Sequence, residues 1–149
     1  MRETQDPDAT QLSIQRTYPV APEKVWRAWT EPQALKQWFG TGETASVSTA
    51  EVDLRVGGRF RIAFRAPGGE THEASGDYQE VDINRRLVFS WSWKGTPERV
   101  SRITIELTPM DGGTDLKFVH DRFFDAQARD NHAKGWPPFF DALGVYLRT

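Results

Sequence analysis

Between residues 45 and 121, apolar and polar residues alternate along the chain, and clusters of turn-forming residues interrupt the alternation. Successive side chains of a β-strand point to opposite faces of a sheet, so this pattern predicts antiparallel strands with one apolar face and one polar face. The interruptions predict turns at 56–59, 67–69, 82–85, 95–97 and 111–113. We expect the first to be a tight hairpin, because paired glycines supply the positive φ angles that two-residue loops require. About six strands result.

One face of the predicted sheet is consistently apolar. The residues expected on it are Phe60, Ile62, Phe64, Leu87, Phe89, Trp91, Trp93, Ile103, Ile105, Leu107, Leu116, Phe118 and His120. The opposite face carries charged residues such as Arg61, Arg102 and Glu106, as expected for a sheet that is wet on one side. The apolar face therefore needs a cover from elsewhere in the chain.

The segment before the meander predicts one more strand and two short helices. Residues 12–18 alternate apolar and polar, which indicates a first strand. Proline is well tolerated in a first helical turn, and apolar residues follow at helical spacing after Pro22 and after Pro32. We expect the second helix to stop at Gly40 and Gly42.

The C-terminal residues predict the amphipathic helix that covers the sheet. Its apolar face holds Trp136, Phe140, Leu143 and Leu147. We place the regular helix from Trp136 onward, because Pro137 and Pro138 lack amide hydrogens and cost least in a first turn; residues 125–134 would form a separate turn. A helix of about 13 residues reaches only ~20 Å, whereas six strands span ~25–30 Å. Either the short helices and bulky rings complete the core, or space remains for a bound molecule.

Composition and motifs exclude several functions. The chain has no cysteine, so disulfides and thiolate chemistry are excluded and a cytoplasmic location is expected. A net charge of −2 offers no attraction to nucleic acid, and no apolar run approaches the ~20 residues of a membrane span. No serine-nucleophile motif or phosphate loop occurs, and the spacing of His72, His120 and His132 matches no metal site. We expect no cofactor, no metal and no membrane insertion.

Bulky rings supply the candidate ligand contacts. The chain holds six Trp and nine Phe, which predicts a large apolar interior. The nine candidates are Trp38, Phe39, Phe64, Trp91, Trp93, Phe118, His120, Trp136 and Phe140. Each ring could instead serve only core packing, while Trp38 and Phe39 are expected at an entrance because glycines follow them. His120 could be a hydrogen-bonded core histidine, orient a polar ligand group or act as a base.

Eight short motifs follow one another over nearly the whole chain. They are APEKVW at 21–26, TEP at 30–32, WFG at 38–40, VGGRF at 56–60, SGDY at 75–78, RLVFSW at 86–91, FVHDRF at 118–123 and HAKGW at 132–136. Together they resemble the START-like superfamily, also called SRPBCC, and within it the domain similar to homologues of the activator of the ninety-kilodalton heat-shock protein ATPase. The resemblance implies an α+β helix-grip fold, in which a curved antiparallel sheet of six or seven strands wraps around a long C-terminal helix and a deep cavity. The sequence departs from that pattern at Glu31, where an N-cap aspartate is common, and at the Pro137 and Pro138 pair.

These observations lead to one leading hypothesis and two alternatives. Residues 1–11 are expected to be a flexible segment, and 12–149 a single START-like ligand-binding domain. The leading hypothesis is binding of a small hydrophobic or amphipathic molecule, lipid-like or polyketide-like, between the sheet and the C-terminal helix. An alternative is a cyclase-like or hydrolase-like enzyme in which His120 moves protons. A chaperone partner, with regulation of its ATPase, is implied only by the resemblance.

Overall fold

The computed structural model describes residues 10–39, 46–65 and 69–149. Most of the predicted flexible segment 1–11 therefore lies outside the described residues. The same holds for the predicted helix stop at Gly40 and Gly42 and for the first two positions of the turn at 67–69.

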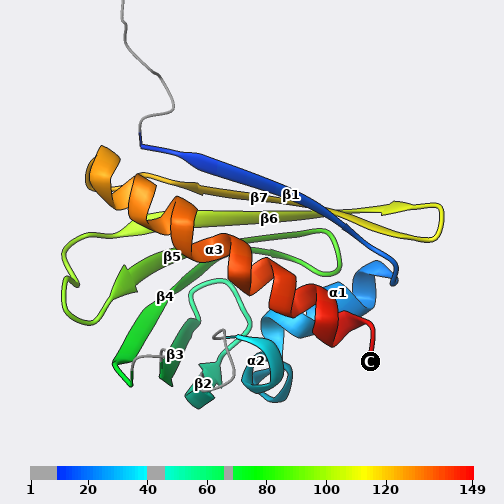
Figure 1. The fold of residues 1–149 in the computed structure, drawn as a ribbon, viewed down its shortest axis with the longest axis horizontal. Helices are drawn as coiled ribbons and strands as arrows, with labels where there is room; N and C mark the ends of the chain where they lie inside the picture. The colour runs from blue at the N-terminus through cyan, green and yellow to red at the C-terminus, as the bar shows by residue number, and fades with distance from the viewer. Residues whose placement is uncertain (1–9, 40–45, 66–68) are drawn as a thin grey trace, which may run out of the picture.

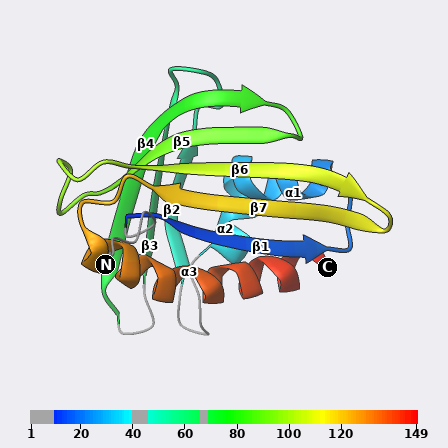
Figure 2. The same cartoon turned by 90° about the horizontal axis from the view of Figure 1, so that it is seen from above.

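Seven strands form one antiparallel sheet in the order β1-β7-β6-β5-β4-β3-β2. Their bounds are β1 (Leu12–Tyr18), β2 (Ser46–Val52), β3 (Arg59–Arg65), β4 (Thr71–Asp82), β5 (Arg86–Trp93), β6 (Ser101–Met110) and β7 (Gly113–Asp121). The sheet is strongly curved, and one long helix, α3 (Ala126–Leu147), lies against its concave face (Figure 1 and Figure 2). The predicted helix-grip fold is confirmed.

The alternation in the sequence identifies the residues that face α3, although β5 is buried on both of its faces. All of the residues predicted on the apolar face are buried except Trp93, which is half-buried. On the outer face, ion pairs link neighbouring strands: Arg61 Nη2 lies 3.0 Å from Glu51 Oε2, and Arg102 Nη2 lies 2.6 Å from Asp121 Oδ2. Such cross-strand pairs support the antiparallel register, and the exposed pair between Arg61 and Glu51 contributes little to stability.

The tight hairpin predicted at 56–59 is wrong. Residues 53–58 form a longer loop between β2 and β3, and only Gly57 has a positive φ, of 86°. A Cβ on Gly58 would lie 2.1 Å from the backbone oxygen of Asp53, so this glycine is required by close approach rather than by its φ angle. The turns predicted at 82–85 and 111–113 are present, with positive φ at Asn84 and Gly112.

Two short helices follow β1, as predicted: α1 (Pro22–Thr30) and α2 (Pro32–Trp38). Each begins at a proline, and the stripe of buried residues on α1 includes Val25 and Trp29. The indole Nε1 of Trp38 donates a hydrogen bond of 2.8 Å to the carbonyl oxygen of Ala28, which ties α2 to α1. The two helices therefore pack as one unit beneath the end of α3 (Figure 1).

The predicted start of the C-terminal helix at Trp136 is wrong, because α3 is one helix of 22 residues that includes both prolines. Its N-cap is Asp125, whose carboxylate accepts a hydrogen bond of 2.8 Å from the Ala128 amide. The carbonyl groups that lose a donor to Pro137 and Pro138 belong to two exposed residues, Ala133 and Lys134, where water can replace the missing N–H groups.

Tertiary packing keeps α3 continuous across the prolines, since the apolar stripe on its inner face is buried along the helix from Trp136 to Leu147. At 1.5 Å per residue the helix is about 33 Å long. The helix length of about 13 residues, on which the comparison with the width of the sheet rested, is therefore wrong, and any cavity has to arise from side-chain packing. No helix among the described residues is long and apolar enough to cross a membrane.

Candidate functional site

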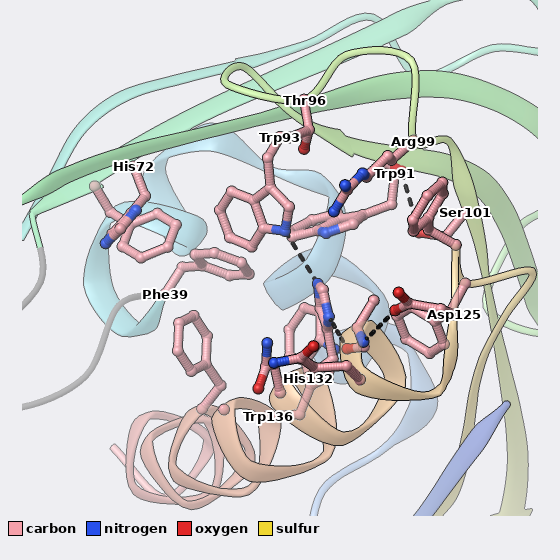
Figure 3. A pocket seen from close by; sticks show the side chains of 18 residues that line it. Phe39, His72, Trp91, Trp93, Thr96, Arg99, Ser101, Asp125, His132 and Trp136 are labelled. Atoms are coloured by element: carbon pink, nitrogen blue, oxygen red, sulfur yellow. Dashed lines mark hydrogen bonds between the residues drawn. The ribbon is translucent and has the colours of Figure 1, made fainter. Parts of the chain in front are cut away.

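A cavity of about 770 Å³ lies between the sheet and the N-terminal half of α3. Figure 3 shows side chains from both elements converging on it. Eight aromatic rings line it: Phe39, Phe64, Trp91, Trp93, Phe123, Phe124, Trp136 and Phe139. The polar lining comes from His72, Thr96, Arg99, Ser101, Asp125, Gln127, Asn131 and His132. Small-molecule sites usually combine an apolar and aromatic lining with polar groups that fix the orientation of the ligand.

The periodicity of each element places these rings. Period two in β5 puts Trp91 and Trp93 on the same face, and their ring centroids lie 5.3 Å apart at an interplanar angle of 85°. On α3, Trp136 projects toward the sheet, and its ring lies 5.3 Å from that of Trp91. Phe39, just after α2, contacts both the sheet and α3. Its ring centroid lies 5.5 Å from that of Phe64 in β3 and 4.8 Å from that of Phe139 in α3. The interlocked rings give the cavity preformed walls.

Five of the nine candidate residues line the cavity, namely Phe39, Phe64, Trp91, Trp93 and Trp136. The other four lie in the core behind it: Trp38, Phe118, His120 and Phe140 are each at most 2% exposed. Trp38 is thus not at an entrance, because its indole is covered and hydrogen-bonded to α1. That the five lining rings contact a ligand stays a prediction.

His120 is held between two cavity residues by hydrogen bonds. Trp136 Nε1 donates to His120 Nδ1 at 3.1 Å, and His120 Nε2 lies 2.7 Å from Ser101 Oγ. An indole N–H can only donate, so Nδ1 carries no proton and the neutral ring must carry its proton on Nε2. Burial, with a smaller contribution from nearby His132, holds the pKa of His120 well below 6.5. His120 is therefore a neutral, hydrogen-bonded core histidine.

This arrangement disfavours His120 as a catalytic base. The lone pair on Nδ1, which a base would need, already accepts a hydrogen bond from Trp136, and the Nε2–H donates to Ser101. Ser101 Oγ in turn donates to the carbonyl oxygen of Trp91 at 3.1 Å. A serine that accepts from the imidazole cannot lose its proton to it, so the pair lacks the polarity of a nucleophile and its base.

A second indole and imidazole pair joins the sheet to α3 at the cavity wall. His132 Nδ1 donates to the Ala128 carbonyl oxygen at 2.7 Å, and its Nε2 accepts from Trp93 Nε1 at 3.0 Å (Figure 3). Desolvation lowers the pKa of His132, although the hydrogen bond to the Ala128 carbonyl opposes this shift. His132 is therefore neutral as well, and both of its ring nitrogens are engaged.

Sequence reasoning did not select His132, Phe123, Phe139 or Arg99 as ligand contacts. The signal for His132 was present, because it lies one helical turn before Trp136 and two turns before Phe140. Dividing the helix at the prolines concealed this stripe. In the described part of the chain, no group of three or more His, Asp or Glu residues is arranged to hold a metal ion.

The two buried histidines predict a pH-dependent stability. Because their pKa values in the folded protein lie below 6.5, the unfolded chain binds more protons below that pH, and stability falls as pH falls. Each histidine contributes up to about 1.4 kcal/mol per pH unit. We expect the free energy of unfolding, from urea titrations, to decrease between about pH 7 and about pH 5.5, above the ordinary range of carboxylates.

The variant His120→Gln tests the assignment, because glutamine can accept from Trp136 and donate to Ser101 without titrating. This variant should clearly reduce the slope of the unfolding free energy against pH. The slope that remains should be due to His132. A wild-type stability that is flat over this interval, or an unchanged slope in the variant, would contradict the assignment.

The curved sheet, the helix that it grips and the cavity between them define a START-like domain. A family model described as Activator of Hsp90 ATPase homolog 1-like protein matches residues 19–148, and the chain belongs to this family. The predicted family resemblance is thereby confirmed.

Solved structures with the same fold support this assignment. Protein NE0264 from Nitrosomonas europaea is 28% identical, with a TM-score of 0.79 over 97% of this chain and 98% of that one. Protein CV1439 from Chromobacterium violaceum is 29% identical, with a TM-score of 0.84 over 94% and 98%. The AHSA1-like protein from Aeromonas hydrophila, 24% identical, shares the fold with a TM-score of 0.77 over 93% and 92%. A comparison with curated proteins gives no match.

Proposed function

We propose that this protein binds a small hydrophobic or amphipathic molecule, lipid-like or polyketide-like, in the cavity between the sheet and α3. The observation that carries the proposal is a cavity of about 770 Å³ with eight aromatic rings in its wall. Pockets for drug-sized ligands have volumes of about 300–1,000 Å³ and mostly apolar linings. Size and lining both fit a guest of that class.

The energy available for binding comes from desolvating apolar surface. Burying about 300 Å² of apolar ligand surface yields ~7 kcal/mol before entropic losses, which supports micromolar affinity. The walls are already held in place: Trp93 is hydrogen-bonded to His132, and Trp136 to His120. Little of the binding energy is therefore spent on ordering the site.

Gly135 provides the test, because it lies in α3 at the cavity wall and a Cβ there would meet nothing within 4 Å. We expect Gly135→Phe to fold but to occupy the mouth of the cavity. Binding of the uncharged dye N-phenyl-1-naphthylamine, followed by its fluorescence, should weaken at least about tenfold, which corresponds to a loss of ~1.4 kcal/mol. Gly135→Ala should retain binding and gain up to about 1 kcal/mol of stability from helix propensity.

Ala133→Phe is the matched control, since Ala133 is an exposed residue of the same helix that does not line the cavity. It adds the same ring and should bind the dye like the wild type. If the wild type binds no member of a panel of apolar dyes, lipids and polyketide-like compounds, the proposal fails. It also fails if Gly135→Phe binds the dye as tightly as Ala133→Phe does.

The family description names a chaperone ATPase, but no contact or charge cluster in the described residues favours a chaperone partner over a small ligand. The enzymatic alternative is disfavoured by the direction of the hydrogen bonds at His120 and Ser101.

A further inference from the structure

Arg99 is the cationic side chain at the mouth of the cavity. It lies in the loop between β5 and β6 and lines the cavity together with Phe124. Its guanidinium carbon sits 4.0 Å from the centroid of the Phe124 ring. Its backbone N–H donates to the Thr96 carbonyl oxygen at 3.0 Å, so the loop that carries it is a defined turn. The cation is thus placed by stacking and by its backbone.

Among the described residues Arg99 forms no hydrogen bond with a carboxylate, in contrast to Arg61 and Arg102. Arg102 donates two hydrogen bonds, of 3.0 and 2.6 Å, to Asp121, and Arg61 donates two, of 3.2 and 3.0 Å, to Glu51. For Arg99 the neighbouring Glu98 carboxylate comes no closer than 4.0 Å, which exceeds hydrogen-bond length. Among the described residues its guanidinium donates no side-chain hydrogen bond.

The stacking leaves the donors of Arg99 available. A guanidinium that covers an aromatic ring uses its flat face, while its N–H donors point outward in the plane and match both oxygens of a carboxylate. The other charged or titratable groups of the lining do not compete for that role. Asp125 caps α3 through Oδ1, His132 is neutral with both nitrogens engaged, and His72 lies beyond Trp93 (Figure 3).

We infer that the preferred ligand is an amphipathic aromatic anion, whose planar apolar body lies among the cavity rings and whose carboxylate is bound by Arg99. This inference rests on the proposed function, because it assigns the ligand class of the same cavity. Figure 3 shows Arg99 on the same side of the cavity as Trp91, with His132 and Trp136 opposite. A flat ring between these walls would place a terminal carboxylate near the guanidinium.

The test uses a pair of probes that differ in charge and hardly in shape: 2-naphthoate, an aromatic carboxylate, and 2-naphthamide, its uncharged analogue. Each displaces N-phenyl-1-naphthylamine from the full-length protein. We expect the carboxylate to bind at least about tenfold more tightly than the amide, as a charge-assisted bidentate contact would give. Arg99→Gln should remove most of this preference while changing amide binding less than about twofold.

Arg85→Gln is the control, because Arg85 lies in the turn between β4 and β5, outside the cavity lining. It should leave both probes unchanged. Raising the salt concentration should weaken only the carboxylate, since Arg99 is partly exposed and its charge is screened. Arg99→Lys should retain part of the preference, because it keeps the charge and loses the planar donors.

The outcomes separate this inference from the proposed function. A wild type that binds the dye but prefers the carboxylate by less than about twofold overturns the inference and leaves the proposed function in place. Equal weakening of both probes in Arg99→Gln also overturns it, because the arginine would then contribute to binding by its size and not by its charge. A wild type that binds none of the three molecules overturns both.

Discussion

Replacing Gly76 with alanine is expected to lower the free energy of unfolding by about 3 kcal/mol or more, the range in which a single substitution can unfold a domain. Gly76 lies in β4, and a Cβ there would sit 1.8 Å from the backbone oxygen of Ser90 in β5. The neighbouring Asp77 amide donates to Ser90 Oγ at 2.8 Å, which holds the two strands at this separation. The clash is with backbone and cannot be relieved by a side-chain rotation. Urea titration followed by circular dichroism measures the loss.

Gly95→Ala is the matched control. A Cβ on Gly95, in the loop between β5 and β6, would meet nothing within 4 Å. We expect its stability to stay within about 1 kcal/mol of the wild type, as for most exposed sites. Equal stability of the two variants would show that β4 and β5 can separate at Gly76 and that the close approach is not required.

Phe118→Ala should cost about 3–5 kcal/mol, the usual range for truncating a buried phenylalanine. Phe118 is 0% exposed and lies at the centre of the contact between α1, β7 and α3. Its ring centroid is 6.2 Å from that of Trp29, 5.0 Å from that of Trp136 and 5.0 Å from that of Phe140. Removing it opens a void that these rings cannot close without losing their own contacts.

The control for this substitution is Phe124→Ala, because Phe124 is 61% exposed at the cavity rim. It removes the same ring and should change stability by less than about 1 kcal/mol. Chemical denaturation of both variants gives the comparison. A loss below about 1 kcal/mol for Phe118→Ala would mean that the core can collapse into the space, against the packing described for it.

The sheet could be predicted from the sequence because its signal is local. Period two identifies the buried side of a strand regardless of the partner strand, and the buried residues of β6 and β7 follow it, whereas β5 is buried on both faces from Leu87 to Trp91. The loop at 53–58 could not be predicted, because the need for Gly58 arises from the approach of Asp53, a contact that exists only in the folded loop. Paired glycines alone do not distinguish a required angle from a required distance.

The C-terminal helix was mispredicted because a local rule was outweighed by packing. Two prolines oppose a helix, but the buried face from Trp136 to Leu147 spans both sides of them. For the candidate site, the alternation predicted which rings face α3. It could not predict which of them line the cavity and which lie in the core behind it. Phe118 and Trp93 have the same pattern, yet only Trp93 lines the cavity.

The polar part of the candidate site depends on pairs that are distant in sequence. The hydrogen bond between Trp93 and His132 joins residues 39 positions apart, and no spacing rule relates them. Arg99 could not be separated from the other arginines by sequence, because its distinguishing property is its place in the cavity wall, stacked on Phe124.

The pairing of β1 with β7 has a consequence for the synthesis of the chain. Gln15 in β1 donates to Asp115 in β7, a residue 100 positions later, so the first strand stays unpaired until most of the chain has been translated. Contacts between such distant segments carry a large loop-closure cost and slow the search for the native state. Because α3 follows β7 and forms one wall of the cavity, the cavity can form only after α3 has left the ribosome. A molecule that entered the cavity would therefore meet a folded domain and could not template the early steps of its folding.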